Sequence, residues 1–358
     1  MTKLMVVDDS PLMRRLLTDI FTAAGDFEVE VARSGAEALA RLTDFAPDVV
    51  TLDIHMPGMD GLACLDQIML IRPCPVVMVS SLTAEGADET LEAMALGAVD
   101  FIAKPRGAVS LEIDAVVPEL VAKVRAAAGA RISRATRLRE RVRALGTPTP
   151  TPAPTPLASS PRRAGLPAEG LVLVGCSTGG PAALDALLGR LPSDFPWPIL
   201  VAQHMPASFT GPLARRLDRL CALPVSEVVR SAPLLAGNIY IARGDADILV
   251  TRRAGALTAI AAPSDPALFW HPSVDRVVES AMTQLDPSNL IGVLMTGMGT
   301  DGARAMTELK ARGGVTIAEA ADTAVVWGMP GALVGADGAS FVVPLDRIAG
   351  ELTTLFAR

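Results

Sequence analysis

The stretch LMVVDD at residues 4–9 is a short apolar run that ends in two aspartates, and DVVTLD at residues 48–53 is a second run that ends in one. Runs of this length fit buried strands, whereas residues 11–24 between them place apolar side chains at helical spacing. The alternation continues, with strands predicted at residues 4–7, 28–32, 48–52, 75–80 and 99–103. Five strands that alternate with helices predict a doubly wound parallel sheet over residues 1–107.

A proline-rich segment divides the chain, whose 358 residues are enough for two domains. Residues 147–157, TPTPTPAPTPL, favour an extended polyproline II conformation and exclude a helix. We interpret them as a spacer, with a binding motif for a proline-recognition module as the alternative. The chain is therefore predicted to have a helical and proline-rich linker at residues 108–167 and a second domain at residues 168–358.

The second domain repeats the alternation of strands and helices. Longer strands are predicted at residues 170–175, 199–203, 290–295 and 315–318, and shorter strands with turns occupy residues 225–262. Half of the chain is hydrophobic but only 4% is aromatic, so the cores consist of Ala, Val, Leu and Ile, as is usual for helices on parallel strands. These features predict a doubly wound α/β fold with a partly antiparallel edge.

Composition argues against several classes of protein. The net charge of −7 disfavours a general nucleic-acid binder, and no apolar run reaches the roughly 18 residues of a membrane helix. The four cysteines form no CxxC pair and the chain has three histidines, so neither a zinc ribbon nor a redox motif is indicated. Because the N-terminal residues lack the apolar core of a signal peptide, we predict a cytoplasmic protein without membrane insertion. The basic residues from Lys123 to Arg143 are expected to form a solvated helix face, with docking to an acidic surface as the alternative.

Polar and charged residues stand at the strand ends of the first domain. Asp8 and Asp9 follow its first strand and Asp53 its third, while Ser80 and Lys104 stand at the ends of the fourth and fifth. The carboxyl ends of parallel strands share one edge of the sheet, so these side chains should lie together. Three carboxylates gathered there repel one another, and Mg²⁺ is the cation expected among them. A carboxylate beside bound Mg²⁺ can accept a phosphoryl group.

Four segments, VVDDS, LDIHMPGMDGL, VVMVSSLT and FIAKP, resemble the signature segments of response-regulator receiver domains. The resemblance covers residues 1 to about 107. It implies that Asp53 is the phosphoacceptor and that Asp8 and Asp9 hold Mg²⁺ together with it.

The same resemblance assigns roles around the phosphoacceptor. It implies that Ser80, Phe101 and Lys104 respond to the phosphoryl group, and that the peptide bond before Pro105 is cis. We expect His55, two residues after the acceptor, to be exposed and structural, with tuning of the phosphate lifetime as the alternative.

A serine stands at the turn after the first strand of the second domain, in GCSTGGP at residues 175–181. Glycines let the backbone bend sharply there, and Ser177 fits the short pattern G-x-S-x-G. His204, in QHMP, follows the next predicted strand after a spacing of about one helix and one strand. Ser177 and His204 should therefore lie at the ends of neighbouring strands. Cys176 is expected to be a packed small residue, with a competing thiol nucleophile as the alternative.

A carboxylate follows another buried strand, in TGMGTDGA at residues 296–303. Asp301 can orient His204, or it can cap the helix that follows it. The order Ser, His, Asp differs from that of ordinary α/β-hydrolases. His271 is expected to be structural, with a contact in the substrate groove as the alternative. Backbone N–H groups that can stabilise an oxyanion are those of Thr178, Gly179, Gly180 and Met298.

The segments GCSTGGP, QHMP, HPSVD and TGMGTDGA together resemble the catalytic domain of the chemotaxis protein-glutamate methylesterases, over about residues 168–355. The order receiver, linker, esterase is also that family's architecture. The resemblance implies that Ser177 is the nucleophile, His204 the general base and Asp301 its orienting partner, and it implies no cofactor for the esterase.

The resemblance also implies a biological role. The substrate would be a glutamate γ-methyl ester on the cytoplasmic helices of chemoreceptors, and some members of the family also deamidate glutamine. A histidine kinase of the chemotaxis system would phosphorylate the receiver, which covers the esterase cleft until it is phosphorylated. Three alternatives stay open: a phosphorylation-controlled adaptor without catalysis, the same esterase acting on a receptor array outside chemotaxis, and a transcriptional regulator. The acidic charge and the absence of a recognition-helix pattern disfavour the last.

Overall fold

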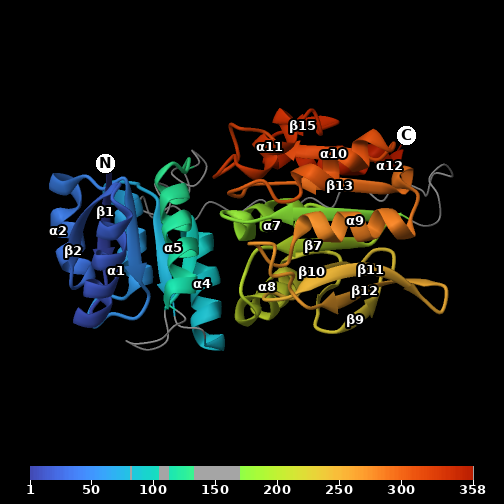
Figure 1. Cartoon of the computed structure of the whole chain (residues 1–358). Coiled ribbons are helices and arrows are strands. Elements are labelled where there is room, and N and C mark those ends of the chain that lie inside the picture. Colours follow the sequence, from blue (N-terminus) through green and yellow to red (C-terminus); the bar gives the residue numbers. More distant parts are fainter. Residues whose placement is uncertain (81–82, 105–112, 133–169, 358) are drawn as a thin grey trace, which may run out of the picture. The chain divides into compact units, whose positions relative to one another are not determined.

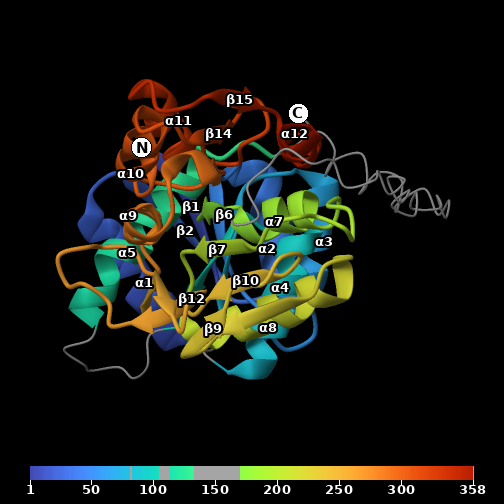
Figure 2. The same ribbon diagram turned by 90° about the vertical axis from the view of Figure 1, so that its right-hand side faces the viewer.

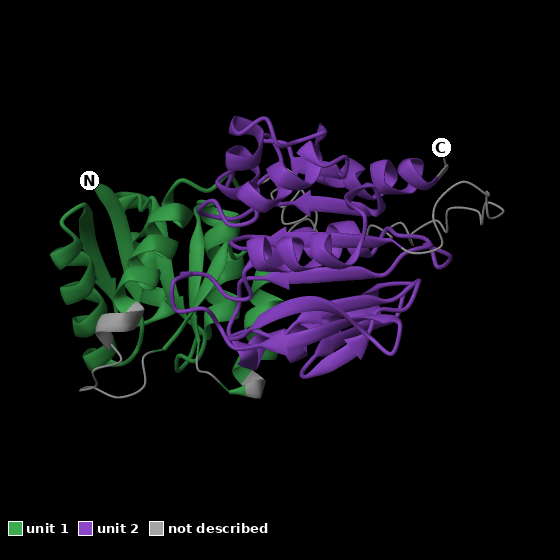
Figure 3. Ribbon diagram, turned by 45° about the vertical axis from the view of Figure 1, so that its right-hand side comes forward, with its two compact units in different colours: residues 1–151 green, residues 152–358 purple. Residues whose placement is uncertain are grey.

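Parallel strands flanked by helices build both units of the chain, which divide between residues 151 and 152 in the computed structural model (Figures 1 and 3). The structure describes residues 1–80, 83–104, 113–132 and 170–357. Most of the predicted linker, the arginine-rich end of its helix and the predicted cis bond before Pro105 therefore lie outside the described residues. Among the described helices, none is both long and apolar enough to cross a bilayer.

The first unit contains one five-stranded parallel sheet in the order β2-β1-β3-β4-β5. Its strands are β1 (Thr2–Val7), β2 (Phe27–Ala32), β3 (Val49–Asp53), β4 (Val76–Ser80) and β5 (Asp100–Ala103). Its helices are α1 (Pro11–Ala24), α2 (Gly35–Phe45), α3 (Gly61–Ile71), α4 (Ala84–Leu96) and α5 (Ile113–Ala128). β3 and β4 are buried along their whole length, as expected for strands that helices cover on both faces. β2 lies on one side of β1, and the later strands β3, β4 and β5 lie on the other side. The strand order therefore reverses at β1, and the ends of β1 and β3 flank the crevice where open α/β sheets bind ligands.

The second unit is built on a seven-stranded sheet in the order β15-β14-β13-β6-β7-β10-β8, in which all neighbouring strands are parallel. The strands are β6 (Leu171–Cys176), β7 (Ile199–Gln203), β8 (Val225–Val228), β10 (Ile239–Ala242), β13 (Leu290–Leu294), β14 (Val315–Glu319) and β15 (Phe341–Val343). The helices are α7 (Gly180–Leu188), α8 (Ala207–Leu220), α9 (Val274–Gln284), the 3₁₀ turn η1 (Pro287–Asn289), α10 (Ala303–Ala311), α11 (Met329–Gly335) and α12 (Leu345–Ala357).

Of the shorter strands expected at residues 225–262, β8 and β10 join the large parallel sheet and the other three form a separate antiparallel sheet. This small sheet has the order β11-β12-β9, with β9 (Ser231–Pro233), β11 (Asp247–Arg253) and β12 (Ala256–Ala262). Figures 1 and 2 show this sheet beside β10, at the opposite end of the unit from β15. The predicted α/β class is confirmed, and the antiparallel part is a sheet of its own.

The position of β6 in the large sheet decides where a site can form. β6 pairs with β7 on one side and with β13 on the other, and Cys176 at its end lies opposite Gln203. The loops after β6, β7 and β13 therefore leave the sheet at the same edge. This brings residues that are more than a hundred positions apart in the sequence to one place.

Candidate functional site

The three aspartates predicted for the first unit come together at the ends of β1 and β3. One ligand oxygen from each of Asp8, Asp9 and Asp53 lies within 4.8 Å of the others, with Asp8 and Asp53 buried and Asp9 exposed. Lys104 reaches the same point from the end of β5. Its ammonium Nζ lies 2.7 Å from Asp53 Oδ2 and 3.4 Å from Asp8 Oδ2.

The electrostatics of this cluster favour a bound cation. Burial raises the pKa of Asp8, and the neighbouring charge of Asp53 raises it further. Burial also opposes the charge on Lys104, but its contacts with Asp53 and Asp8 outweigh this and raise its pKa. A set of carboxylate oxygens this close together is the ligand type that Mg²⁺ prefers, so the residues present fit the predicted metal.

Two other predicted residues lie close to the cluster in the sheet. Ser80 is buried at the end of β4, and its hydroxyl donates to the carbonyl of Gly86 at 3.1 Å. Phe101 is buried in β5, and Lys123 of α5 places its ammonium 5.2 Å from the centre of the Phe101 ring. The expectation that Lys123 belongs to a solvated face is wrong. Its side chain is 6% exposed and pairs with Glu119 at 3.2 Å, because α5 packs this side of the helix on the sheet.

His55 is exposed, as predicted, and its Nε2 lies 3.1 Å from Glu89 Oε2 on α4. Its backbone N–H donates to Asp53 Oδ1 at 3.2 Å, so the loop after β3 is tied to the carboxylate of Asp53. The side chain itself points to a neighbouring helix. The predicted structural role is compatible with this pairing.

In the second unit, Ser177 stands immediately after β6 and is 3% exposed. Its N–H donates to the carbonyl of Thr296 at 2.9 Å, which joins the loop after β6 to the loop after β13. Gly179 has a φ of +78°, a conformation that only glycine adopts at low cost, and α7 begins at the next residue. The strand therefore turns into the helix over three residues, with the serine at the bend.

His204 follows β7 and contacts Asp301 as predicted. Its Nε2 lies 2.9 Å from Asp301 Oδ2, while its Nδ1 is buried and has no hydrogen-bond partner in the described chain. Since an ionised carboxylate only accepts hydrogen bonds, Nε2 carries the proton and Nδ1 keeps a free lone pair. Trp270 stacks on the imidazole, with ring centres 5.5 Å apart and planes 7° from parallel. The structure thus brings His204 and Asp301 into contact, whereas a hydrogen bond between Ser177 and His204 is not formed.

Asp301 is held by more than the histidine. Its carboxylate accepts from the N–H groups of Val274 at 2.7 Å and Asp275 at 3.0 Å and from the Ser273 hydroxyl at 3.1 Å. Burial alone would raise its pKa, but the hydrogen bond from His204 and the two backbone donors lower it overall. The alternative role as a cap of the following helix is wrong, because α10 has no side-chain cap. Asp301 instead accepts from the first two N–H groups of α9, whose N-cap residue is Ser273.

The candidate oxyanion donors are not equivalent. The N–H of Gly180 already donates to the carbonyl of Ser177 at 2.7 Å, so Gly180 is removed from the predicted set. Within residues 170–357, the N–H groups of Gly179 and Met298 have no hydrogen-bond partner. Together with Thr178, they stay candidates for binding a developing negative charge.

Two further predictions concern residues near the site. The thiol of Cys176 is fully buried, and burial raises its pKa, so it does not compete with Ser177 as a nucleophile. His271 places Nδ1 3.0 Å from Asp247 Oδ1, and this buried carboxylate also pairs with Arg276. The pairing agrees with a structural role for His271, since it anchors the loop before α9.

Sequence reasoning missed three groups that shape the site. Trp270 covers His204, and Thr296 holds the serine loop through its carbonyl and through its hydroxyl, which donates to Thr178 O at 2.8 Å. Glu319, at the end of β14, accepts from the N–H of Thr296 at 2.8 Å. The signal for Glu319 was a carboxylate at the end of a buried strand, the same signal that identified Asp53.

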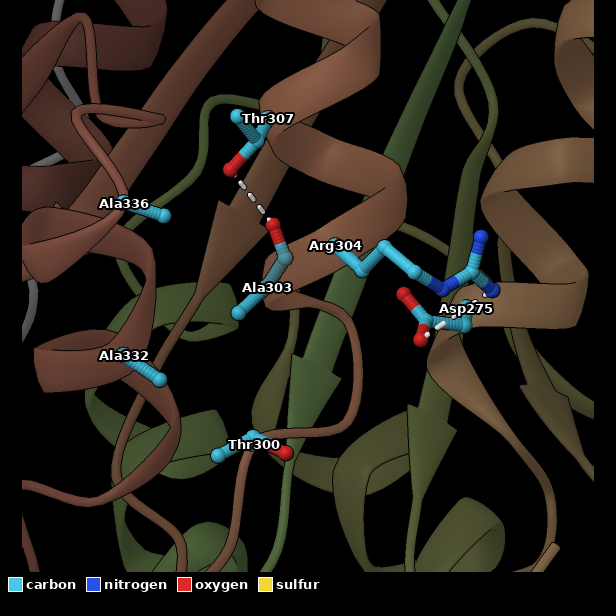
Figure 4. A pocket seen from close by; sticks show the side chains of 7 residues that line it. All are labelled: Asp275, Thr300, Ala303, Arg304, Thr307, Ala332 and Ala336. Carbon is cyan, nitrogen blue, oxygen red and sulfur yellow. Dashed lines mark hydrogen bonds and ion pairs between the residues drawn. The ribbon is translucent and has the colours of Figure 1, made fainter.

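A separate open pocket of about 530 Å³ lies beside the loop that carries Asp301 (Figure 4). Thr300 lines one end, and α9 and α10 contribute Asp275 and Arg304, whose charged groups are 3.4 Å apart. Arg304 also pairs with Glu279 at 2.5 Å. None of the predicted catalytic side chains lines this pocket. The guanidinium of Arg304 is already neutralised by the carboxylates of Asp275 and Glu279.

Comparisons with known proteins agree with this geometry. The family model for the CheB methylesterase matches residues 172–352, and that for the response regulator receiver domain matches residues 4–113. A protein-glutamate methylesterase/protein-glutamine glutaminase of Rhodopseudomonas palustris is 55% identical over 98% of this chain and 97% of its own length. One of Rhodospirillum rubrum is 53% identical over 100% of this chain and 97% of its own length.

Among solved structures, the catalytic domain of the Thermotoga maritima CheB methylesterase is 37% identical to this chain. The match covers 52% of this chain and 98% of that domain, with a TM-score of 0.51. The relatives that match over nearly the full length at more than 50% identity and the matching fold of the catalytic domain point to the same family. The chain belongs to the CheB methylesterase family, as an enzyme that carries a response regulator receiver domain in its N-terminal part.

Proposed function

We propose that this enzyme hydrolyses glutamate γ-methyl esters on the cytoplasmic helices of chemoreceptors, with release of methanol, and that phosphorylation of Asp53 increases the rate. The observation that carries the proposal is the free Nδ1 lone pair of His204. It belongs to a ring that Asp301 holds through Nε2, at the end of the strand next to that of Ser177. In this proposal the protein works in the cytoplasm, where the receptor helices are.

The first half of the reaction forms an acyl-enzyme. Ser177 Oγ attacks the ester carbonyl carbon while its proton moves to Nδ1 of His204, and Asp301 stabilises the imidazolium that results. The negative charge that develops on the carbonyl oxygen is bound by N–H groups of the loops after β6 and β13, and each such donor is worth ~10²–10³ in rate. The intermediate collapses when Nδ1 returns the proton to the methoxy oxygen, and methanol leaves.

The second half regenerates the enzyme. His204 takes a proton from water, whose oxygen attacks the acyl carbon, and the same nitrogen then protonates Ser177 Oγ. The products are the free serine and the γ-carboxylic acid of glutamate, which ionises at neutral pH. Burial of Ser177 and the cover that Trp270 forms over His204 limit the access of bulk water to both steps.

The receiver supplies the control. In the proposal a histidine kinase of the chemotaxis system, or a small phosphodonor, transfers a phosphoryl group to Asp53. Mg²⁺, held by Asp8, Asp9 and Asp53, would neutralise charge on the phosphoryl oxygens. Lys104, which now pairs with Asp53, would pair with the new phosphate, and the hydroxyl of Ser80 would turn from Gly86 to donate to it. Phe101 would follow the movement of β4 and β5.

Deamidation of receptor glutamines is a second candidate function, because both relatives named above are also called protein-glutamine glutaminases. The same residues serve this reaction. The only difference is that Nδ1 of His204 protonates the amide nitrogen, which leaves as ammonia, instead of the methoxy oxygen, which leaves as methanol. Ammonia release from receptors that carry glutamine at the modified positions measures this activity separately.

The test uses purified full-length protein and receptor membranes whose glutamates carry labelled methyl esters. We expect Ser177→Ala to abolish methanol release and labelling by a serine-reactive fluorophosphonate. Ser226→Ala, at an exposed position of β8, is the matched control and should behave as wild type. Methanol release by Ser177→Ala at the wild-type rate would refute the proposed nucleophile. Wild-type protein that takes up the probe but releases no methanol from any receptor would refute the proposed substrate.

A further inference from the structure

The side chain of Gln203 lies between the two residues that are proposed to exchange a proton. Gln203 is the last residue of β7, directly before His204, and it is 2% exposed. Its amide Nε2 donates to the carbonyl of Ser177 at 3.0 Å and to that of His204 at 3.0 Å. One buried amide group therefore joins the backbones of the proposed nucleophile and the proposed base.

The orientation of this amide is fixed on its other side. The thiol of Cys176 donates to Gln203 Oε1, with 3.0 Å between sulfur and oxygen. The backbone carbonyls of Ser177 and His204 only accept hydrogen bonds, so the NH₂ group must face them, and the amide oxygen faces the thiol of Cys176. Both N–H bonds of the amide and its oxygen are thus used, which leaves no alternative rotamer of equal energy.

The start of α7 is shaped around this side chain. A Cβ atom at Gly180 would lie 1.8 Å from Gln203 Oε1, so only glycine leaves room for the amide. The N–H of Gly180 also donates to the Ser177 carbonyl, which therefore accepts two hydrogen bonds, one from the start of α7 and one from the end of β7. The third glycine of the GCSTGGP motif, Gly180, is explained by this packing.

Alignment of the catalytic pair needs such a connection. Ser177 and His204 do not hydrogen-bond through their side chains, so their separation depends on the backbones that carry them. One backbone contact, His204 N–H to Cys176 O at 3.1 Å, joins the strand ends, and the amide of Gln203 adds the contact to Ser177 itself. A misplacement of about 1 Å is enough to cost ~10²-fold in rate.

We propose that Gln203 is a positioning residue for this hydrolase, which holds the carbonyls of Ser177 and His204 so that Oγ and Nδ1 come within proton-transfer distance. The proposal rests on the roles given above to Ser177 and His204. It gives the glutamine of the QHMP motif a function that does not involve contact with the substrate.

Two substitutions remove the donors while they keep the length of the side chain. Gln203→Met is unbranched and apolar, and Gln203→Glu replaces the NH₂ group by an oxygen that both carbonyls repel. We expect each to lower kcat for methanol release by about 10²-fold with little change in KM, since neither touches the substrate. Labelling of Ser177 by the fluorophosphonate should slow by a similar factor, and the pH at which kcat is half-maximal should not move.

Cys176→Ala is the matched variant, because it removes the third hydrogen bond of the same amide but leaves both N–H donors in place. A lost weak thiol bond should cost no more than about threefold in kcat. Folding is followed by tryptophan fluorescence, since Trp197, Trp270 and Trp327 all belong to the second unit. Rates are compared per folded molecule, so a variant that is only less stable is not counted as slow.

Wild-type kcat in folded Gln203→Met would overturn the proposal, as would an equal loss in Cys176→Ala and Gln203→Met. Failure of the proposed function looks different: Ser177→Ala would then still release methanol. Loss of activity in Ser177→Ala together with full activity in Gln203→Met would reject the positioning role alone.

Discussion

The two candidate sites occupy equivalent places in their sheets but are held together by different forces. In the first unit, the buried carboxylates of Asp8 and Asp53 meet the half-buried ammonium of Lys104, so two of the three groups carry the same sign. In the second unit, the loops of Ser177 and His204 are joined by neutral hydrogen bonds between backbone groups and buried polar side chains. The first arrangement brings like charges together, whereas in the second the backbones of the two loops are held by neutral hydrogen bonds.

This difference agrees with the proposed division of work. A cluster of like charges is sensitive to one added phosphoryl group, because each new charge changes every pairwise interaction in a partly buried place. A hydrogen-bonded site keeps its geometry and suits a reaction in which fixed donors stabilise the transition state. The proposed switch in the first unit and the proposed ester chemistry in the second are both compatible with this difference.

Asp301 is the exception, since it is an ionised group inside the hydrogen-bonded site. We expect Asp301→Asn to lower kcat by ~10³–10⁴-fold, because an amide in this place can donate to His204 and favour the wrong tautomer. The measurement is methanol release by purified protein at saturating receptor. If the loss were less than tenfold, the charge would not be needed, and the base would be oriented by the stacked Trp270 instead.

Asp275→Asn is the control for that experiment. Asp275 lies at the same helix end and accepts from the N–H of Ala305 at 2.8 Å, but it makes no contact with His204. Its substitution disturbs the packing of α9 against α10 but leaves the contact between Asp301 and His204 in place. A large loss in this variant as well would mean that the terminus of α9, and not the carboxylate of Asp301, sets the rate.

The next largest effect is expected in the charged cluster. Phosphorylation of Asp53 should raise the esterase rate by roughly 5–150-fold, which corresponds to a coupling of ~1–3 kcal/mol between the units. Asp53→Asn should abolish this stimulation, measured as the ratio of rates with and without acetyl phosphate and Mg²⁺. Asp60→Asn keeps an N-cap for α3 and should respond as wild type. Equal stimulation of Asp53→Asn and wild type would place the phosphoacceptor elsewhere.

Much of the fold could be predicted because it follows from local pattern. The helix at Pro11–Ala24 has its predicted bounds, since it begins after the capping side chain of Ser10 and presents one apolar stripe. The strand ends were also located correctly, and they carry Asp8, Asp53, Ser177 and His204. The rule that parallel strands end at one edge then brought these residues together without any knowledge of the tertiary structure.

The contacts that complete the site could not be predicted in this way. Asp301 accepts from the first N–H groups of α9, whose first residue lies 27 positions earlier, and this pairing depends on how two helices pack. Trp270 belongs to an irregular loop, so no periodicity points to its place on His204. Gln203 ends β7, which is buried along its whole length, and only the register with Cys176 shows what its amide reaches.

Glu319 offers the test with the smallest expected effect on activity. Its titratable side chain is buried behind the hydrogen-bonded site. Its Oε1 is buried without a partner in the described chain, and burial raises its pKa from 4.5 to about 7. Between these two values the unfolded chain loses the proton while the folded protein keeps it, so the free energy of unfolding falls as the pH rises and the loss is complete above about pH 7. A shift of this size corresponds to roughly 3 kcal/mol.

Glu319→Gln removes this ionisation but keeps an oxygen that can accept from Thr296. We therefore expect the variant to gain roughly 2–3 kcal/mol relative to wild type between about pH 5 and pH 8, measured as the change in unfolding free energy in urea. Tryptophan fluorescence reports this transition in the second unit alone, since all three tryptophans lie there. If the unfolding free energies of wild type and variant instead changed with pH in parallel, ionisation of Glu319 in the folded protein would carry no such cost. The hydrogen-bonded site would then tolerate a buried charge as readily as the receiver does.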